Sequence, residues 1–132
     1  MVSTKGRYAL RVIIDLAEQD TKDYIPLKDI AERQDISKKY LEIIAKDLVK
    51  GGIIEGASGK KGGYRLKKPA DKISAGEIIK LMEGSIAPVA CLADGAEKCP
   101  RHDVCKTLGM WEELYKMEND FFNSRKISDF LS

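Results

Sequence analysis

Residues 37–66 read SKKYLEIIAKDLVKGGIIEGASGKKGGYRL and contain the change of pattern that decides the fold. In the first half, apolar residues recur at helical spacing and give a helix one apolar face: Leu41, Ile44, Ala45 and Leu48. Ser37 suits the N-cap of this helix, and Gly51-Gly52 suits its end. In the second half, short apolar runs at 53–55 and 64–66 flank a glycine-rich stretch, which is typical of a β-hairpin.

Two further helical patterns precede this stretch. Apolar residues at helical spacing predict a helix over residues 4–18. A shorter helix follows Pro26, which suits a first helical position, and ends near Gln34, with a short strand at Tyr24–Ile25 between the two helices. Two short helices joined by a tight turn form a helix-turn-helix, and a hairpin after it completes the layout of a winged helix. We therefore expect a mainly α fold with a small β-hairpin wing.

The C-terminal half predicts two more helices. Ser74 and Glu77 match a capping box, in which each side chain accepts the free backbone N–H of the other, at the start of a helix that ends at Gly84. Residues 85–105 have no regular pattern. A long helix is expected from about residue 106 to 123, because apolar residues follow at spacings of four, three and four, as in a coiled-coil seam: Met110, Leu114, Met117 and Phe121.

The charge is unevenly distributed along the 132 residues. Residues 1–68 carry 15 Lys and Arg against 10 Asp and Glu, a balance of +5, and residues 69–132 carry 8 against 11, a balance of −3. A basic half indicates an anionic partner such as nucleic acid, although an ordinary solvated surface would give the same charge. Because no run of eighteen apolar residues and no apolar signal stretch occurs, we expect no membrane partner and a cytoplasmic location.

Three regions have the side chains expected to contact double-stranded DNA. The helix after Ser37 has charged residues opposite its apolar stripe and can read base edges in a major groove, although a solvated face is the alternative. The hairpin has no acidic residue from 56 to 70, and its glycines let the backbone approach a phosphate that lysines neutralise. The first helix has basic residues at its N-terminus, where phosphate is favoured. The candidate DNA-binding residues are Lys5, Arg7, Ser37, Lys38, Lys39, Tyr40, Glu42, Ser58, Lys60, Lys61 and Gly62.

All three cysteines lie within fifteen residues, at Cys91, Cys99 and Cys105. An odd number in a reducing compartment argues against disulfides, and thiolates bind zinc and iron–sulfur clusters well. The one histidine, His102, permits a Cys3His zinc site, although structural zinc sites usually have paired Cys-x2-Cys spacing. From spacing alone, an iron–sulfur cluster and a zinc site are about equally well supported, and a simple thiol switch is less well supported than either. An enzyme with a catalytic cysteine is disfavoured, because the one histidine lies in a loop without an evident substrate pocket.

The sequence resembles the Rrf2 family of bacterial transcription regulators over nearly its whole length. The resemblance rests on the order and spacing of five segments: STKGRYAL at 3–10, YLE at 40–42, GGY at 62–64, SAGEII at 74–79 and EGSIAPVAC at 83–91. It implies a homodimer with a winged helix-turn-helix and a long C-terminal dimerisation helix. It also implies that Cys91, Cys99 and Cys105 ligate a [2Fe-2S] or [4Fe-4S] cluster, which raises the cluster above zinc.

Three departures from the family pattern limit this transfer. Similar members have a histidine three residues after the last cysteine, where this chain has Leu108, or an aspartate on the partner's first helix, where it has Arg7. The fourth ligand therefore stays open, with water or a small thiol possible beside the local candidates His102, Asp94, Glu97 and Asp103. Ser58 replaces an arginine before the wing glycines, so the sequence preference should differ.

The resemblance and the patterns together predict the organisation of the chain. Residues 1–83 are expected to form the winged helix-turn-helix DNA-binding domain, 84–105 the cysteine-bearing cluster loop, and 106–132 the dimerisation helix and tail. The expected function is promoter binding by a homodimer, as repressor or activator, tuned by a cluster that senses iron, redox state or nitric oxide. The alternative is the same regulator with a structural zinc site or a thiol switch in the loop.

Overall fold

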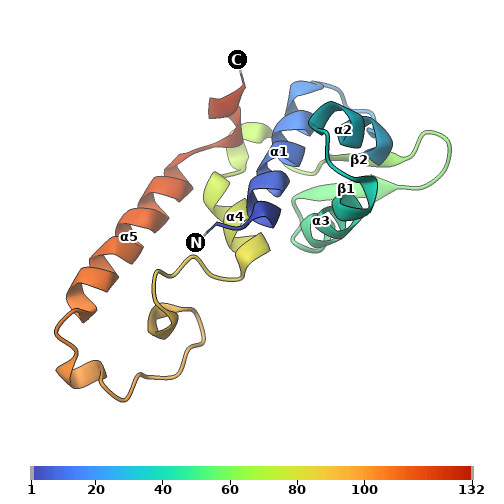
Figure 1. Ribbon diagram of the computed structural model, residues 1–132. Helices are drawn as coiled ribbons and strands as arrows, with labels where there is room; N and C mark the ends of the chain where they lie inside the picture. The colour runs from blue at the N-terminus through green and yellow to red at the C-terminus, as the bar shows by residue number, and fades with distance from the viewer. Residues whose placement is uncertain (1, 132) are drawn as a thin grey trace.

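A computed structural model describes residues 2–131 as helices around a small hairpin (Figure 1). The main elements are α1 (Thr4–Glu18), α2 (Leu27–Gln34), α3 (Lys38–Lys50), β1 (Ile54–Ala57), β2 (Gly63–Leu66), α4 (Ala75–Glu83) and α5 (Leu108–Ser124). Four short 3₁₀ turns complete them: η1 (Ala70–Lys72), η2 (Ala90–Leu92), η3 (His102–Val104) and η4 (Ile127–Phe130). This order confirms the winged-helix layout. None of the helices in residues 2–131 combines the length and hydropathy of a membrane span.

Local caps explain where the helices begin. The hydroxyl oxygen of Ser37 accepts the amide of Tyr40 at 3.2 Å, and that of Ser3 accepts the amide of Gly6 at 3.3 Å. Each bond satisfies one of the amides that a helix leaves free in its first turn. At its other end α2 stops at Asp35, which has a left-handed φ of 53° and so turns the chain toward α3. These caps hold α2 and α3 as the helix-turn-helix.

The wing is an antiparallel hairpin whose register runs from the Ile54–Leu66 pair to the Ala57–Gly63 pair. The predicted short strand at Tyr24–Ile25 is present as one bridge, in which the amide and carbonyl of Ile25 pair with those of Tyr64 at 2.8 Å each. Gly63 has a φ of 143°, and a Cβ there would clash with the carbonyl of Ile25. Glycine therefore lets the segment before α2 approach the wing.

Of the two hydrogen bonds in the capping box predicted at the start of α4, one is present and the other is not. The Ser74 hydroxyl does accept the amide of Glu77, at 3.1 Å. The carboxylate of Glu77, however, does not return to the backbone of Ser74, because the ammonium of Lys68 lies 2.9 Å from it and donates to it instead. The Glu77 side chain thus fixes the segment after the wing to α4.

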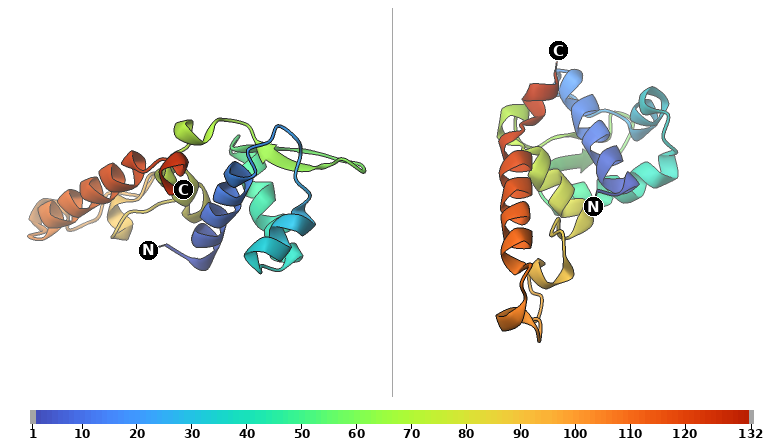
Figure 2. Two further views of the ribbon diagram at one scale, coloured as in Figure 1. Left: turned by 90° about the horizontal axis from the view of Figure 1, so that it is seen from above. Right: turned by 60° about the vertical axis from the view of Figure 1, so that its left-hand side comes forward.

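The core lies between α1, α2, α3, α4 and the hairpin, and the end of the chain returns to it. Ile127 in η4 is completely buried in this core. The Ile127 amide donates to the carbonyl of Ile73 at 2.9 Å, and the amide of Ala75 donates to the carbonyl of Arg125 at 2.8 Å. The tail of the chain is therefore part of the winged-helix unit. The C-terminal part of α5 runs beside α4, and its N-terminal half extends away from the core (Figures 1 and 2). Residues 85–105 lead from α4 to this N-terminal end of α5.

Candidate functional site

The outward face of α3 carries the charged side chains predicted for base reading. Lys38, Lys39 and Glu42 are exposed, while the apolar stripe of α3 is buried. Tyr40 is only half-exposed, because its ring packs edge-on against Tyr8 of α1 with 5.8 Å between the ring centroids. Tyr40 therefore helps to set the position of α3 on α1.

An open groove of about 430 Å³ joins α2, α3 and the wing. It brings together three of the predicted DNA-binding residues, Lys38, Glu42 and Gly62, from two separate parts of the chain. It also includes Lys28, which the sequence reasoning did not single out. The sequence does contain a feature that could have identified Lys28: it follows Pro26 in the first turn of α2, and the N-terminus of a helix attracts anions. The groove is thus a continuous surface over which a phosphate backbone could run.

The wing extends from the body of the molecule (Figure 1). Ser58, Lys60 and Lys61 are all exposed, and no ion pair among residues 2–131 involves either lysine. At the base of the wing Arg65 is already paired, since its Nε lies 2.7 Å from a carboxylate oxygen of Glu55. Within residues 54–66 the unpaired positive charge is therefore at the tip.

The start of α1 is joined to both α3 and α4. The ammonium of Lys5 pairs with the carboxylate of Asp47 on α3 at 2.5 Å, so part of its charge is used within the protein, whereas Arg7 is exposed. The amide and hydroxyl of Ser3 donate to one oxygen of Glu83 at 2.9 and 2.5 Å. Burial raises the pKa of Glu83, but the two hydrogen bonds from Ser3 and the charge of Lys5 lower it, and the net pKa is below its ordinary value. Glu83 immediately precedes the cysteine loop.

The three cysteines are free thiols on the irregular segment between α4 and α5. Cys91 is exposed, and Cys99 and Cys105 are half-buried. In residues 2–131 no three His, Cys, Asp or Glu side chains come close enough together to hold a metal ion. The sequence places the thiols close together along the chain, and the fold does not gather them into a preformed site.

Cys105 differs from the other two thiols in its surroundings. Hydrogen bonds from the hydroxyl and amide of Thr107, with help from the amide of Leu108 and the charge of Arg101, lower the pKa of Cys105 against the opposing effect of burial. These groups lie at the start of α5, where unpaired amides favour an anion. These contacts favour the thiolate form of Cys105.

The candidates for a fourth ligand are partly engaged with one another. The carboxylate of Asp94 pairs with Lys80 of α4 at 3.0 Å, which attaches the loop to that helix. Asp103 lies 3.2 Å from Nδ1 of His102 and 3.4 Å from the ammonium of Lys98. Glu97 is exposed.

The seam predicted along α5 is uncovered in the single chain. No residue of α5 is buried, and the four seam residues are between 37% and 62% exposed: Met110, Leu114, Met117 and Phe121. A row of exposed large apolar side chains along one helix is typical of an interaction site.

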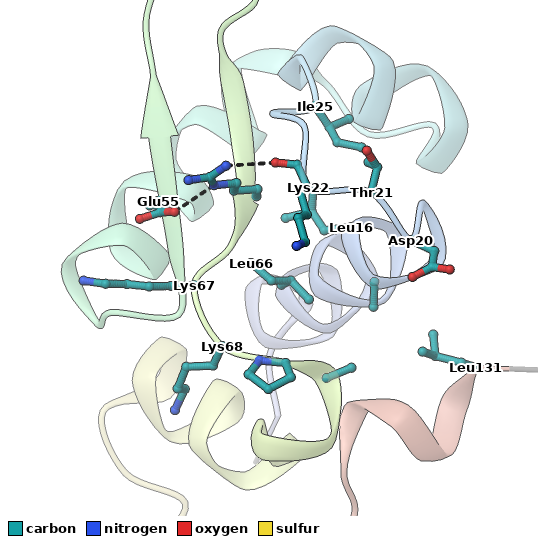
Figure 3. A pocket seen from close by; sticks show the side chains of 14 residues that line it. Leu16, Asp20, Thr21, Lys22, Ile25, Glu55, Leu66, Lys67, Lys68 and Leu131 are labelled. Carbon is teal, nitrogen blue, oxygen red and sulfur yellow. Dashed lines mark hydrogen bonds and ion pairs between the residues drawn. The ribbon is translucent and has the colours of Figure 1, made fainter.

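A larger depression of about 720 Å³ lies apart from these surfaces, between the end of α1, β2 and η4 (Figure 3). Its lining includes the apolar side chains of Leu16, Leu66 and Leu131 together with Lys22 and Lys67. No predicted DNA-binding residue and no cysteine lines it. It therefore belongs to neither of the two candidate sites.

Known proteins are similar in sequence to this chain over nearly its whole length. The chain is 34% identical to HTH-type transcriptional regulator IscR of Pectobacterium atrosepticum over 131 residues, which covers 99% of this chain and 79% of the relative. It is 35% identical to Protein rrf2 of Nitratidesulfovibrio vulgaris over 130 residues, covering 98% of this chain and 86% of that protein.

Solved structures show the same fold over nearly the whole chain. CymR (YrzC), the global cysteine regulator of B. subtilis, matches with a TM-score of 0.77 at 32% identity and covers 98% of this chain and 94% of its own. IscR of T. potens matches with a TM-score of 0.77 at 32% identity, covering 98% of this chain and 84% of the IscR chain. The Rrf2 model, described as an iron-dependent transcriptional regulator, matches residues 2–132. The protein is thus a DNA-binding transcriptional regulator and not an enzyme, and the chain belongs to the Rrf2 family.

Proposed function

We propose that the protein is a homodimer whose affinity for promoter DNA is set by an iron–sulfur cluster on Cys91, Cys99 and Cys105. The observation that carries this proposal is the donor set, which consists of three free thiols on one irregular loop. The family description as iron-dependent and the relatives named IscR support the same assignment.

The loop fits a cluster in its chemistry. Thiolates are the usual ligands of [2Fe-2S] and [4Fe-4S] clusters, and no disulfide competes for these three. Because residues 85–105 contain only short 3₁₀ turns, the thiols can converge without unfolding a helix or strand. When bound, such a cluster supplies a centre whose presence or oxidation state changes with iron, oxygen or nitric oxide.

His102 is the fourth ligand that we favour. A ligating histidine usually donates its second ring N–H to a carboxylate, which fixes the ring. Nδ1 of His102 already lies 3.2 Å from a carboxylate oxygen of Asp103, which leaves Nε2 for a metal. Asp94, in contrast, is paired with Lys80.

The loop is linked to the DNA face through the start of α1. Glu83, at the loop's beginning, accepts both hydrogen bonds from Ser3, and Lys5 nearby on α1 pairs with Asp47 of α3. In a dimer two copies of α3 would enter successive major grooves. Ordering of the loop would shift α4 and α1 and thereby the angle between the two copies of α3. Allosteric couplings of this kind are typically about 1–3 kcal/mol, or about 5- to 150-fold in affinity.

Anaerobic purification with iron and sulfide counts tests the cluster. We expect coloured protein with about two or four irons per chain, as the two cluster types require. Colourless protein with one zinc per chain would contradict the proposal. Metal-free protein that loses DNA affinity on oxidation would instead support a thiol switch, for which the lowered pKa of Cys105 is the favouring observation.

Promoter affinity tests the coupling separately. The cluster-loaded protein and a variant with all three cysteines changed to alanine should differ at least about fivefold in DNA affinity. Val104→Ala is the matched control, because Val104 lies on the same loop, is 63% exposed and should change nothing. Equal affinity of loaded protein and triple variant would contradict the coupling, even if the cluster is present.

A further inference from the structure

The outward face of α3 contains one large apolar side chain among its cations. Ile43 is 54% exposed and is not packed against the hydrophobic core. Counting along the helix, Lys39, Ile43, Lys46 and Lys50 follow at spacings of four, three and four, so they form one row directly opposite the buried stripe. All four side chains are exposed. The centre of this row is therefore an isoleucine with a lysine on each side.

The lysines of this row identify the chemistry of whatever covers Ile43. No ion pair among residues 2–131 involves Lys39, Lys46 or Lys50. Protein interfaces are depleted in lysine at their centres, and Ile43 has no apolar neighbour in its row with which to form an interface core. A polyanion satisfies the three cations. The major groove of DNA combines that charge with an apolar group on the base edge, the C5-methyl of thymine.

We propose that Ile43 contacts a thymine methyl group in the major groove and is a specificity-determining residue of this regulator. The proposal rests on the function above, in which α3 reads the promoter. Lys39 and Glu42 would read hydrogen-bonding groups on neighbouring base pairs, while Ile43 reads a group that no hydrogen bond can detect. Each half-site should then contain a thymine whose methyl group, rather than its hydrogen-bonding edge, is required.

Deoxyuridine scanning of the operator tests this contact, because uracil differs from thymine only by the missing methyl group. The full-length protein first selects its operator from a random duplex library, and each thymine is then replaced by deoxyuridine. Burial of one methyl group corresponds to about fourfold in affinity, so one position in each half-site should cost the wild-type protein about fourfold. With both half-sites substituted the loss should be about fifteenfold, since the two contacts are far apart.

Two variants locate the effect on Ile43. Ile43→Ala should bind the thymine and deoxyuridine operators equally, because its side chain no longer reaches the methyl group. Val49→Ala is the matched control: Val49 is also apolar and 42% exposed on α3 but lies outside the row, so this variant should keep the wild-type loss. Alanine is the best helix former, so both variants should fold.

The outcomes separate this proposal from the one on which it rests. A selected operator that is insensitive to deoxyuridine at every thymine, or an Ile43→Ala variant with the wild-type loss, overturns the Ile43 contact and leaves promoter binding intact. Failure of the wild-type protein to enrich any sequence overturns DNA reading by α3 and the Ile43 contact with it.

Discussion

The pairing of Asp15 with Arg33 predicts a large loss of stability when the arginine is removed. Asp15 on α1 is only 1% exposed although it is charged. Its carboxylate accepts four hydrogen bonds, three from Arg33 at 2.8 to 3.2 Å and one from Gln34 at 2.8 Å. All four donors belong to α2, so this carboxylate fixes the first helix of the helix-turn-helix against α1.

Arg33→Ala leaves a buried carboxylate with one of its four hydrogen bonds. Breaking a fully buried ion pair costs about 3–5 kcal/mol. The Arg33 side chain is 39% exposed, so water can partly replace it, and we expect a loss of about 2–3 kcal/mol in the free energy of unfolding. The double variant Asp15→Leu with Arg33→Met removes both charges and should stay within about 1 kcal/mol of the wild type.

Urea unfolding followed by far-ultraviolet circular dichroism, at one fixed protein concentration, measures these differences. Lys116→Ala is the control, because it removes an exposed pair with Asp120 and should cost less than about 0.5 kcal/mol. The reasoning is refuted if Arg33→Ala costs no more than this control, or if the double variant is as unstable as Arg33→Ala alone.

Three further predictions concern the wing, the seam of α5 and the start of α1. Replacing both Lys60 and Lys61 by alanine should lower the slope of log affinity against log salt by about 1 for each phosphate that the wing no longer neutralises, as fluorescence anisotropy would show; an unchanged slope would mean that the wing tip does not touch DNA. Met117→Lys places a charge in the seam and should convert a dimer to monomers in sedimentation equilibrium, whereas an unaltered mass would show that α5 does not dimerise the protein. Because the folded pKa of Glu83 is lowered, its carboxylate stabilises the protein above its usual pKa of 4.5 and loses this effect as pH falls through the folded value. The melting temperatures of wild type and Glu83→Gln should therefore differ near neutral pH and converge as pH falls through the folded pKa, and a constant difference would contradict this linkage.

The helix boundaries were predictable because the signals that set them are local. Ser37 and Ser74 each cap the helix that follows within three residues, so the sequence alone contains both partners of each contact. The wing was predictable for the same reason, since its two strands are separated by only a glycine-rich tip. Apart from the bridge of Ile25 to Tyr64, the confirmed elements are those whose interactions span a few residues.

Contacts between distant residues decided what the sequence could not show. The carboxylate of Glu77 accepts from Lys68 rather than from the backbone amide of Ser74, because packing brings the lysine nearer than any pattern indicates. The partner of Lys5 is 42 residues away, and no pattern in the tail distinguishes Ile127, which enters the core, from the apolar residues Phe130 and Leu131 that follow it. The DNA contacts, the cluster ligands and the dimer remain predictions, because each depends on a molecule outside this chain.

The return of the chain to the core through Ile127 has a consequence for how this regulator can be divided. A fragment that ends before α5 would lack an isoleucine from its hydrophobic interior and would leave the carbonyl of Ile73 and the amide of Ala75 without their partners. The half that reads DNA and the half that carries the seam must therefore fold as one cooperative unit. Thermal melting of the intact chain should show a single transition, and α5, anchored at its C-terminal end, can act as a lever on the winged helix when its distant end moves.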